Sequence, residues 1–118
     1  MSNPIQEKTI GEIIAEARKN SGLSLRQLAS RIDINYSYLA DIEKTRRIPS
    51  EKVLLALSLQ NELELDFDFL MAHSGRLGTE AEAYLKKHPK FGQLIRLISR
   101  KEFSDSQLVS LIQLVKEK

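Results

Sequence analysis

The sequence contains no cysteine, no tryptophan and only two histidines among its 118 residues. Without cysteine, the chain has no disulfide and no thiolate metal site, and a reducing compartment is its natural location. His73 and His88 lie in different segments, and the chain has no phosphate-binding glycine loop, no His-Glu-x-x-His and no Gly-x-Ser-x-Gly motif. We therefore expect no enzyme activity, no metal and no cofactor.

Long apolar runs are also absent. No segment approaches the roughly 20 consecutive apolar residues that a membrane-spanning helix needs. The first eight residues lack the apolar core of a signal peptide. The sequence therefore predicts a cytoplasmic protein that does not enter a membrane.

The net charge is only +2, but the charges are unevenly placed. Residues 18–47 carry seven Lys or Arg against three Asp or Glu, whereas residues 51–68 carry one Lys against five Asp or Glu. A basic zone followed by an acidic one favours a polarised molecule whose basic face meets a polyanion. Ordinary solvated helix faces give the same pattern, and charge alone does not separate the two interpretations.

Apolar residues recur with the spacing of α-helices along the whole chain, and no strand-like alternation occurs. The capping-box pattern marks three helix starts, at Thr9 with Glu12, Ser24 with Gln27, and Ser104 with Gln107. The other expected helices begin near Asn35, Ser50, Asp66, Thr79 and Pro89, with the one at Asp66 ending near Ala72 and the one at Thr79 ending at His88. Capping also explains Asp66 and Asp68 better than a metal site, because two carboxylates alone bind a metal weakly.

A glycine-containing segment, residues 73–78, divides the chain into residues 1–72 and residues 79–118. The last three helices cannot bury much of a core within about 40 residues, so they pack on the first part or on another copy. The last helix has a wide apolar surface, which favours a homodimer, with packing inside the chain as the alternative. The residues expected at the dimer contact are Leu108, Leu111, Ile112 and Val115.

Residues 25–44 have the pattern of two short helices joined by a tight turn. The small Ala29 lies where two steeply crossing helices come into contact. Asp33 stands where the turn needs a residue that tolerates positive φ. The second helix of such a unit can project its first side chains into a DNA major groove, which is about 12 Å wide.

The stretch GLSLRQLASRIDINYSYLADIEKTRRIPS, residues 22–50, resembles the helix-turn-helix of the Cro and lambda-repressor class, also called Xre-type regulators. The resemblance covers about residues 9–72. It implies an all-α protein: a five-helix lambda-repressor-like DNA-binding domain with a C-terminal three-helix extension, acting as a dimer and commonly as a repressor. The stretch AHSGRLGTEAEAYLKKHPKFGQLIRLIS is more loosely similar to extensions on some of these regulators.

The resemblance also implies roles for individual residues. The groove-facing positions, expected to read bases, are Tyr36, Ser37 and Asp41. Contacts with the DNA backbone are expected from Arg26, Asn35, Lys44, Arg46 and Arg47. Arg18 and Glu43 match positions that pair as a structural salt bridge, and Tyr38 is interpreted as a packing residue.

Two positions depart from the family pattern. Leu25 stands where a glutamine often touches phosphate, so Arg26 or Ser24 would have to replace that contact. Thr45 stands where the family often has a glycine, so the geometry of this loop can differ from that of the family. Asp41 can accept a hydrogen bond from cytosine N4 or bridge to Arg46 or Lys44, and the sequence leaves both alternatives open.

The sequence thus predicts a transcriptional regulator that represses by binding double-stranded DNA as a homodimer. The alternative is a DNA-binding antitoxin whose residues 79–118 hold a partner protein. Some similar regulators are inactivated by a separate protease, although no residue here marks a cleavage site.

Overall fold

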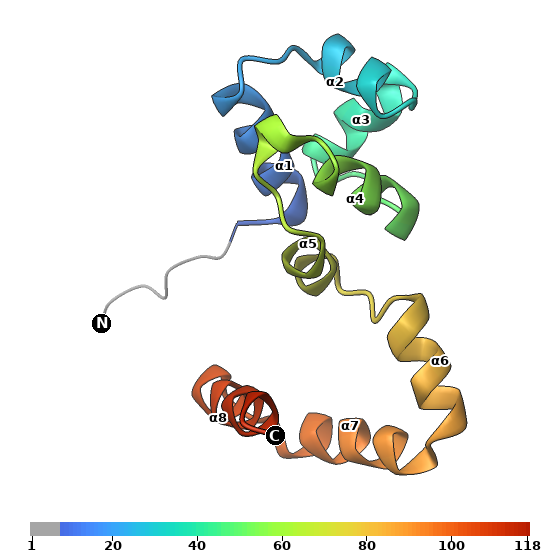
Figure 1. The fold of residues 1–118 in the computed structure, drawn as a ribbon, viewed down its shortest axis with the longest axis vertical. Helices are drawn as coiled ribbons and strands as arrows, with labels where there is room; N and C mark the ends of the chain where they lie inside the picture. The colour runs from blue at the N-terminus through green and yellow to red at the C-terminus, as the bar shows by residue number, and fades with distance from the viewer. Residues whose placement is uncertain (1–7) are drawn as a thin grey trace. The chain divides into compact units, whose positions relative to one another are not determined.

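The structure, a computed structural model, describes residues 8–118. Within this range the chain is entirely helical, with eight α-helices and one 3-10 helix (Figure 1). The elements are α1 (Ile10–Asn20), α2 (Leu25–Arg31), α3 (Tyr36–Glu43), α4 (Glu51–Ser58), η1 (Asn61–Leu63), α5 (Phe67–Ser74), α6 (Thr79–Lys87), α7 (Pro89–Lys101) and α8 (Asp105–Lys116). The all-α fold class predicted from the sequence is confirmed. None of the helices in residues 8–118 combines the length and hydrophobicity required to cross a bilayer.

Capping side chains define most of the helix starts. The Ser24 hydroxyl accepts a hydrogen bond from the Gln27 amide (3.1 Å), and the Gln27 side chain accepts one from the Ser24 amide (2.8 Å). Ser104 and Gln107 form the same reciprocal box at the start of α8. Each pair satisfies two backbone groups that the first helical turn leaves free. Both predicted boxes are therefore confirmed.

The box expected at Thr9 is only half formed. The Thr9 hydroxyl accepts from the Glu12 amide (3.1 Å) and caps α1. Instead of reaching the Thr9 amide, the Glu12 carboxylate accepts a hydrogen bond from the Thr9 hydroxyl (3.1 Å).

The chain divides into two compact units, the first ending at Gly78 and the second comprising Thr79–Lys118. The core of the first unit draws on α1 to α5 and η1; its fully buried large aliphatic side chains are Ile14, Leu28, Leu39, Ile42, Leu54, Leu57 and Leu70. Helix α5 extends two residues beyond its expected end at Ala72, because Gly75 is the first residue to take the left-handed backbone that ends a helix (φ 76°). Beyond it, the Arg76 guanidinium donates to the Pro49 carbonyl (3.0 Å) within the same unit.

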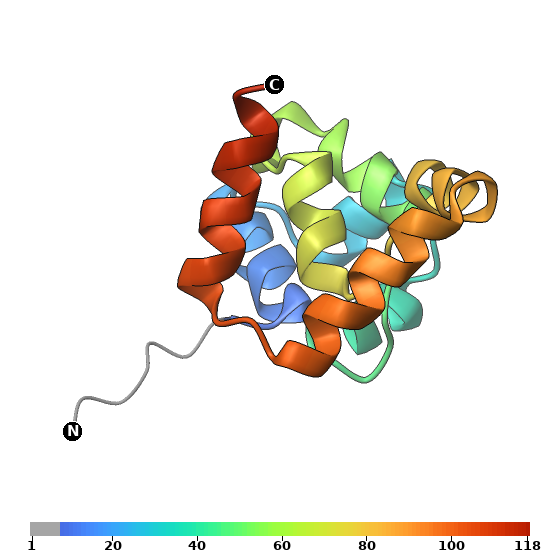
Figure 2. The ribbon, with the colours of Figure 1, turned by 90° about the horizontal axis from the view of Figure 1, so that it is seen from below.

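The second unit consists of three helices, none of which has a buried residue. Tyr84 of α6 stacks on His88 and meets the edge of Phe91 of α7, with ring centroids 4.2 and 5.4 Å apart. Figures 1 and 2 show α7 and α8 extending away from each other from the short turn that joins them. Several apolar side chains of these two helices are exposed, among them Leu94, Ile112 and Val115.

Candidate nucleic-acid interface

Helices α2 and α3 are joined by a turn that fixes their crossing. Asp33 has φ 55°, as its position in the turn predicts. The Ile34 amide donates to the Ala29 carbonyl (3.0 Å), and the Ala29 side chain is buried where the helices meet. The turn therefore presents α3 at the surface with its first turn exposed.

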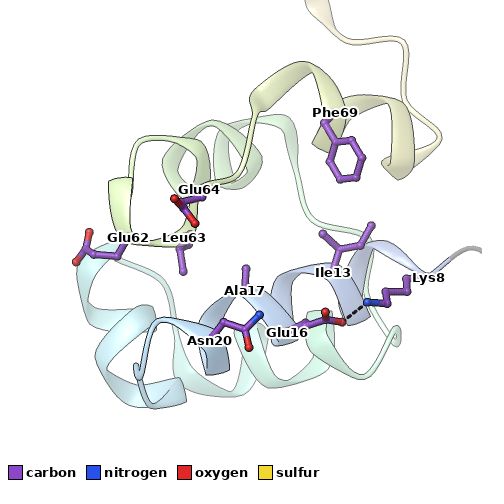
Figure 3. A pocket seen from close by; sticks show the side chains of 9 residues that line it. All are labelled: Lys8, Ile13, Glu16, Ala17, Asn20, Glu62, Leu63, Glu64 and Phe69. Atoms are coloured by element: carbon purple, nitrogen blue, oxygen red, sulfur yellow. Dashed lines mark hydrogen bonds and ion pairs between the residues drawn. The ribbon is translucent and has the colours of Figure 1, made fainter.

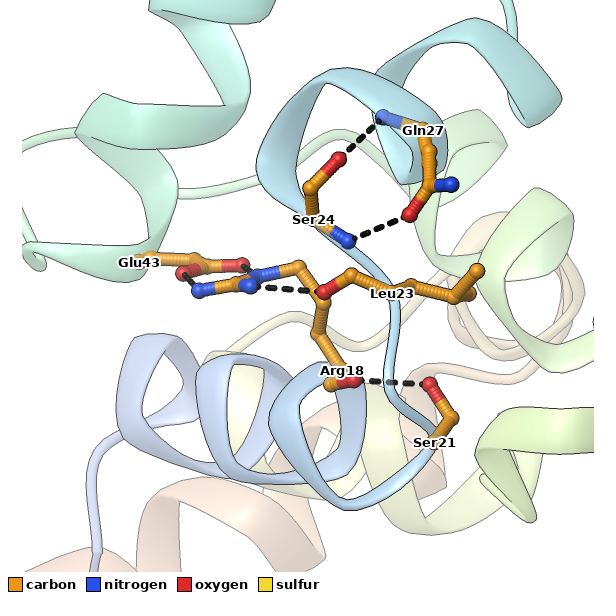
Figure 4. Close-up of polar contacts among 6 residues, drawn as sticks. All are labelled: Arg18, Ser21, Leu23, Ser24, Gln27 and Glu43. Carbon is orange, nitrogen blue, oxygen red and sulfur yellow. Dashed lines mark hydrogen bonds and ion pairs between the residues drawn. The ribbon is translucent and has the colours of Figure 1, made fainter.

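A nearly buried ion pair fixes the C-terminal end of α3 (Figure 4). Arg18 donates from Nε to Glu43 Oε2 (2.7 Å) and from Nη2 to Glu43 Oε1 (3.0 Å), a two-point contact. Its Nη1 donates to the Leu23 carbonyl (2.8 Å). The Arg18 and Glu43 side chains are only 11% and 8% exposed. The pair thus ties α1, the end of α3 and the loop before α2 together, and it is too enclosed to contact DNA.

Gly11 allows α1 and α3 to approach closely. A Cβ atom at this position would lie 2.3 Å from the Ile42 carbonyl oxygen and 2.9 Å from that of Glu43. Any side chain here would push against the backbone at the end of α3. The sequence analysis missed this contact. The sequence feature that could have indicated it is a glycine inside a helix with regular apolar spacing, because such a glycine often allows close packing.

The first turn of α3 is organised by its cap. The Asn35 side chain accepts from the Ser37 amide (2.8 Å) and from the Ser37 hydroxyl (2.7 Å). The Ser37 proton is therefore directed at Asn35, which leaves the oxygen's lone pairs free to accept from a base or a water. Tyr36 is exposed, and the Arg26 guanidinium lies over its ring at 4.6 Å from the centroid.

The end of α3 carries Asp41 close to the loop cations. Asp41 Oδ1 lies 4.0 Å from Arg46 Nη1, with the two side chains 38% and 68% exposed. Within the described part of the chain, Lys44 forms no ion pair with Asp41. An ion pair this long and this exposed contributes little, about 0–1 kcal/mol. Asp41 can therefore exchange it for a base contact at small cost.

Tyr38 and Thr45 shape the surface beside α3. Tyr38 packs partly against the core, as the sequence analysis predicts, while Arg47 lies over its ring at 5.1 Å from the centroid. Thr45 has φ 62°, and its hydroxyl lies 3.0 Å from that of Thr9. The loop thus adopts the left-handed backbone that glycine favours, although a threonine stands there.

Leu25 packs against the core and makes no polar contact, so the phosphate contact expected of a glutamine there has no counterpart. The expected DNA-contacting residues lie on α2, at the N-cap of α3, on α3 itself and in the loop after α3. The expected dimer residues lie on α8 of the second unit. Together with Leu94 and Ile98 of α7, these residues line an apolar groove of about 600 Å³.

A second hollow, of about 380 Å³, lies between α1, η1 and α5 (Figure 3). Its rim carries Glu16, Glu62 and Glu64; Glu16 pairs with Lys8, and Glu62 with Arg31. Hydrogen bonds from its own backbone and from Arg31 lower the pKa of the exposed Glu62 carboxyl below its usual range. An acidic rim repels phosphate, so this hollow does not belong to a DNA-binding surface. Across residues 8–118, no cluster of His, Asp and Glu suits a metal ion.

Residues 14–67 match the helix-turn-helix family model. The chain is 32% identical over 59 residues to the ImmF control region 10 kDa protein of Bacillus phage phi105, covering 50% of this chain and 66% of that protein. It is 29% identical over 58 residues to the transcriptional regulator ClgR of Mycobacterium tuberculosis, covering 49% and 52%. A solved SinR–SinI protein complex aligns with 92% of this chain and 95% of that one, at 26% identity and a TM-score of 0.48. The matched curated relatives are thus spanned over about half to two thirds of their length.

Proposed function

We propose, from the premise that residues 14–67 form a helix-turn-helix domain of the Xre-type class, that the protein is a sequence-specific DNA-binding transcriptional regulator. We propose further that it represses, in the cytoplasm, from an inverted-repeat operator. The observation that carries the proposal is the exposed first turn of α3. It is held by the Asn35 cap at one end and by the Arg18–Glu43 pair at the other.

In this proposal the residues of the surface have two roles, contact with bases and contact with phosphates. Tyr36, Ser37 and Asp41 meet base edges, where each good contact gives about 1–3 kcal/mol of discrimination. The cationic and polar side chains that position the helix on the phosphates are Arg26, Asn35, Lys44, Arg46 and Arg47. The rings of Tyr36 and Tyr38 support two of these cations, since Arg26 and Arg47 lie over them.

Replacing Arg47 with alanine should weaken binding to operator and random duplexes alike, by about tenfold at low salt, and should reduce the salt slope by about 1 per protomer. The reason is that a phosphate contact carries no base information. Fluorescence anisotropy with both duplexes, at several KCl concentrations, measures this. Lys19→Ala, an exposed cation of α1, is the control and should change little. A loss confined to the operator would refute the assigned role.

The apolar groove between α7 and α8 supports a homodimer. Ile112 and Val115 are 53% and 73% exposed, and the groove is lined almost wholly by aliphatic side chains. A second copy would cover the same face on both chains, as two-fold symmetry requires. Two α3 helices related in this way fit half-sites about 34 Å apart on the duplex.

Ile112→Ser combined with Val115→Ser should shift the protein from dimer toward monomer at micromolar concentration. The two substitutions remove exposed aliphatic side chains from the proposed dimer contact. Operator affinity should then fall at least about tenfold. Sedimentation equilibrium measures the association, and Val109→Ser is the control, since Val109 is also exposed on α8 but lies outside the groove. A double variant that stays fully dimeric would contradict the proposed contact.

The same groove also suits a different protein, as in the antitoxin alternative. Wild-type protein that aggregates alone and becomes soluble only with a co-expressed neighbour would support that reading over the homodimer.

A further inference from the structure

The net positive charge of the chain comes from the second unit, although residues 18–47 of the first unit are locally basic. Residues 1–78 contain ten Lys or Arg and eleven Asp or Glu, a net charge of −1. Residues 79–118 contain eight Lys or Arg and five Asp or Glu, a net charge of +3. A DNA-binding unit normally carries a basic surface, because phosphate neutralisation supplies the sequence-independent part of its affinity. In the first unit, the basic zone at residues 18–47 is offset by acidic residues elsewhere in the unit.

Within the second unit, six of the eight cations are gathered in one segment. Residues 83–101 include no Asp or Glu, and all of their cations are exposed: Lys86, Lys87, Lys90, Arg96, Arg100 and Lys101. None of these six takes part in an ion pair with any of the described residues. In the first unit, Lys8, Arg18, Arg31 and Arg46 each face a carboxylate, whereas the cations expected on phosphate at positions 26, 44 and 47 form no ion pair with the described residues.

Two of the four cations of α7, Arg96 and Arg100, lie away from its apolar face. At 100° per residue, Gln93, Arg96 and Arg100 share one side of the helix, whereas Leu94 and Ile98, which line the apolar groove, lie on the other. A partner chain in the groove would therefore leave the arginines exposed. Lys90 and Lys101 lie near the two ends of α7, about 16 Å apart along the helix, on the same side as Leu94.

We propose that Arg96 and Arg100, on the side of α7 opposite its groove residues, form a second phosphate-binding surface for duplex DNA, within a segment that also carries Lys86 and Lys87. It adds sequence-independent affinity to that of the phosphate contacts proposed for the helix-turn-helix unit. The inference rests on the proposed DNA-binding function. It adds that residues 79–118 touch the DNA backbone in addition to joining two copies.

The test compares two double variants of the full chain that lose the same charge. Arg96→Gln/Arg100→Gln removes two cations from the proposed surface, and Lys19→Gln/Lys118→Gln removes two exposed cations elsewhere. Fluorescence anisotropy measures the affinity of each variant for an operator and for a random duplex, at about 50 to 300 mM KCl. Phosphate contacts weaken steeply with salt over about this range. The arginine variant should bind both duplexes at least about tenfold more weakly at low salt, with a salt slope shallower by about 2 per protomer.

The matched variant should change affinity by less than about twofold, and Arg96→Lys/Arg100→Lys should retain the wild-type slope, because the proposed role is charge. Equal effects of the two glutamine variants would overturn the inference. So would an arginine variant that loses binding to phosphatidylserine vesicles but not to DNA. If the wild-type protein binds neither duplex, the proposed DNA-binding function is wrong. If the wild-type protein prefers the operator and the arginine variant binds both duplexes as tightly as the wild type, only the second surface is wrong.

Discussion

Replacing Glu43 with alanine is expected to lower the free energy of unfolding of the first unit by about 3–5 kcal/mol. The substitution leaves the Arg18 guanidinium 11% exposed, with only the Leu23 carbonyl as a partner. A buried charge without its counter-charge is costly, and a small domain is stabilised by only about 5–15 kcal/mol in total. Urea unfolding followed by circular dichroism measures the loss.

Two controls separate the buried charge from a general loss of an ion pair. Glu62→Ala breaks the exposed pair with Arg31 and should cost less than about 1 kcal/mol. The double variant Arg18→Met/Glu43→Leu removes both charges and should recover much of the stability, because no unpaired group remains. Equal losses for Glu43→Ala and Glu62→Ala would contradict this explanation.

Gly11→Ala is expected to destabilise the protein by at least about 2 kcal/mol, although alanine in an ordinary helix position stabilises by about 1 kcal/mol relative to glycine. The new Cβ would lie 2.3 Å from the Ile42 carbonyl oxygen, and backbone cannot move aside as a flexible side chain can. Because the contact is at the end of α3, DNA affinity should fall even under conditions where the variant is fully folded.

The matched control is Gly92→Ala in α7. Its Cβ would meet only the Leu85 Cδ1 atom, at 3.2 Å, which is the end of a flexible side chain. This variant should be near neutral or slightly more stable. Thermal unfolding of both variants, with binding measured at a temperature where each is folded, makes the comparison. A Gly11→Ala protein as stable as the wild type would show that α1 and α3 do not approach as described.

Features that depend on neighbouring residues could be predicted from the sequence. The boxes at Ser24 and Ser104 and the positive φ of Asp33 each follow from a few consecutive residues, and all are present. Features that depend on which helices meet could not. The close approach at Gly11 exists only because the end of α3 lies against α1. The turn η1 was also missed, because its residues carry no capping side chain.

The candidate site shows the same division. Position in the motif indicated that Ser37 and Asp41 belong to the exposed side of α3. The hydrogen bond that commits the Ser37 proton to Asn35, and the choice of Arg46 over Lys44 beside Asp41, are set by side-chain geometry. The sequence analysis also counted charge over residues 18–47 and 51–68 and overlooked residues 83–101. The positive charge of residues 83–101 becomes clear when the unit after Gly78 is considered by itself.

The central claim is that α3 reads base edges in a major groove, and selection of bound sites from random duplexes tests it most directly. Wild-type protein should enrich an inverted repeat with half-sites about 10 base pairs apart. Asp41→Asn should enrich a repeat changed at one position in each half-site, since an amide donates as well as accepts. Identical motifs from both proteins, or no enrichment from the wild type, would contradict the claim.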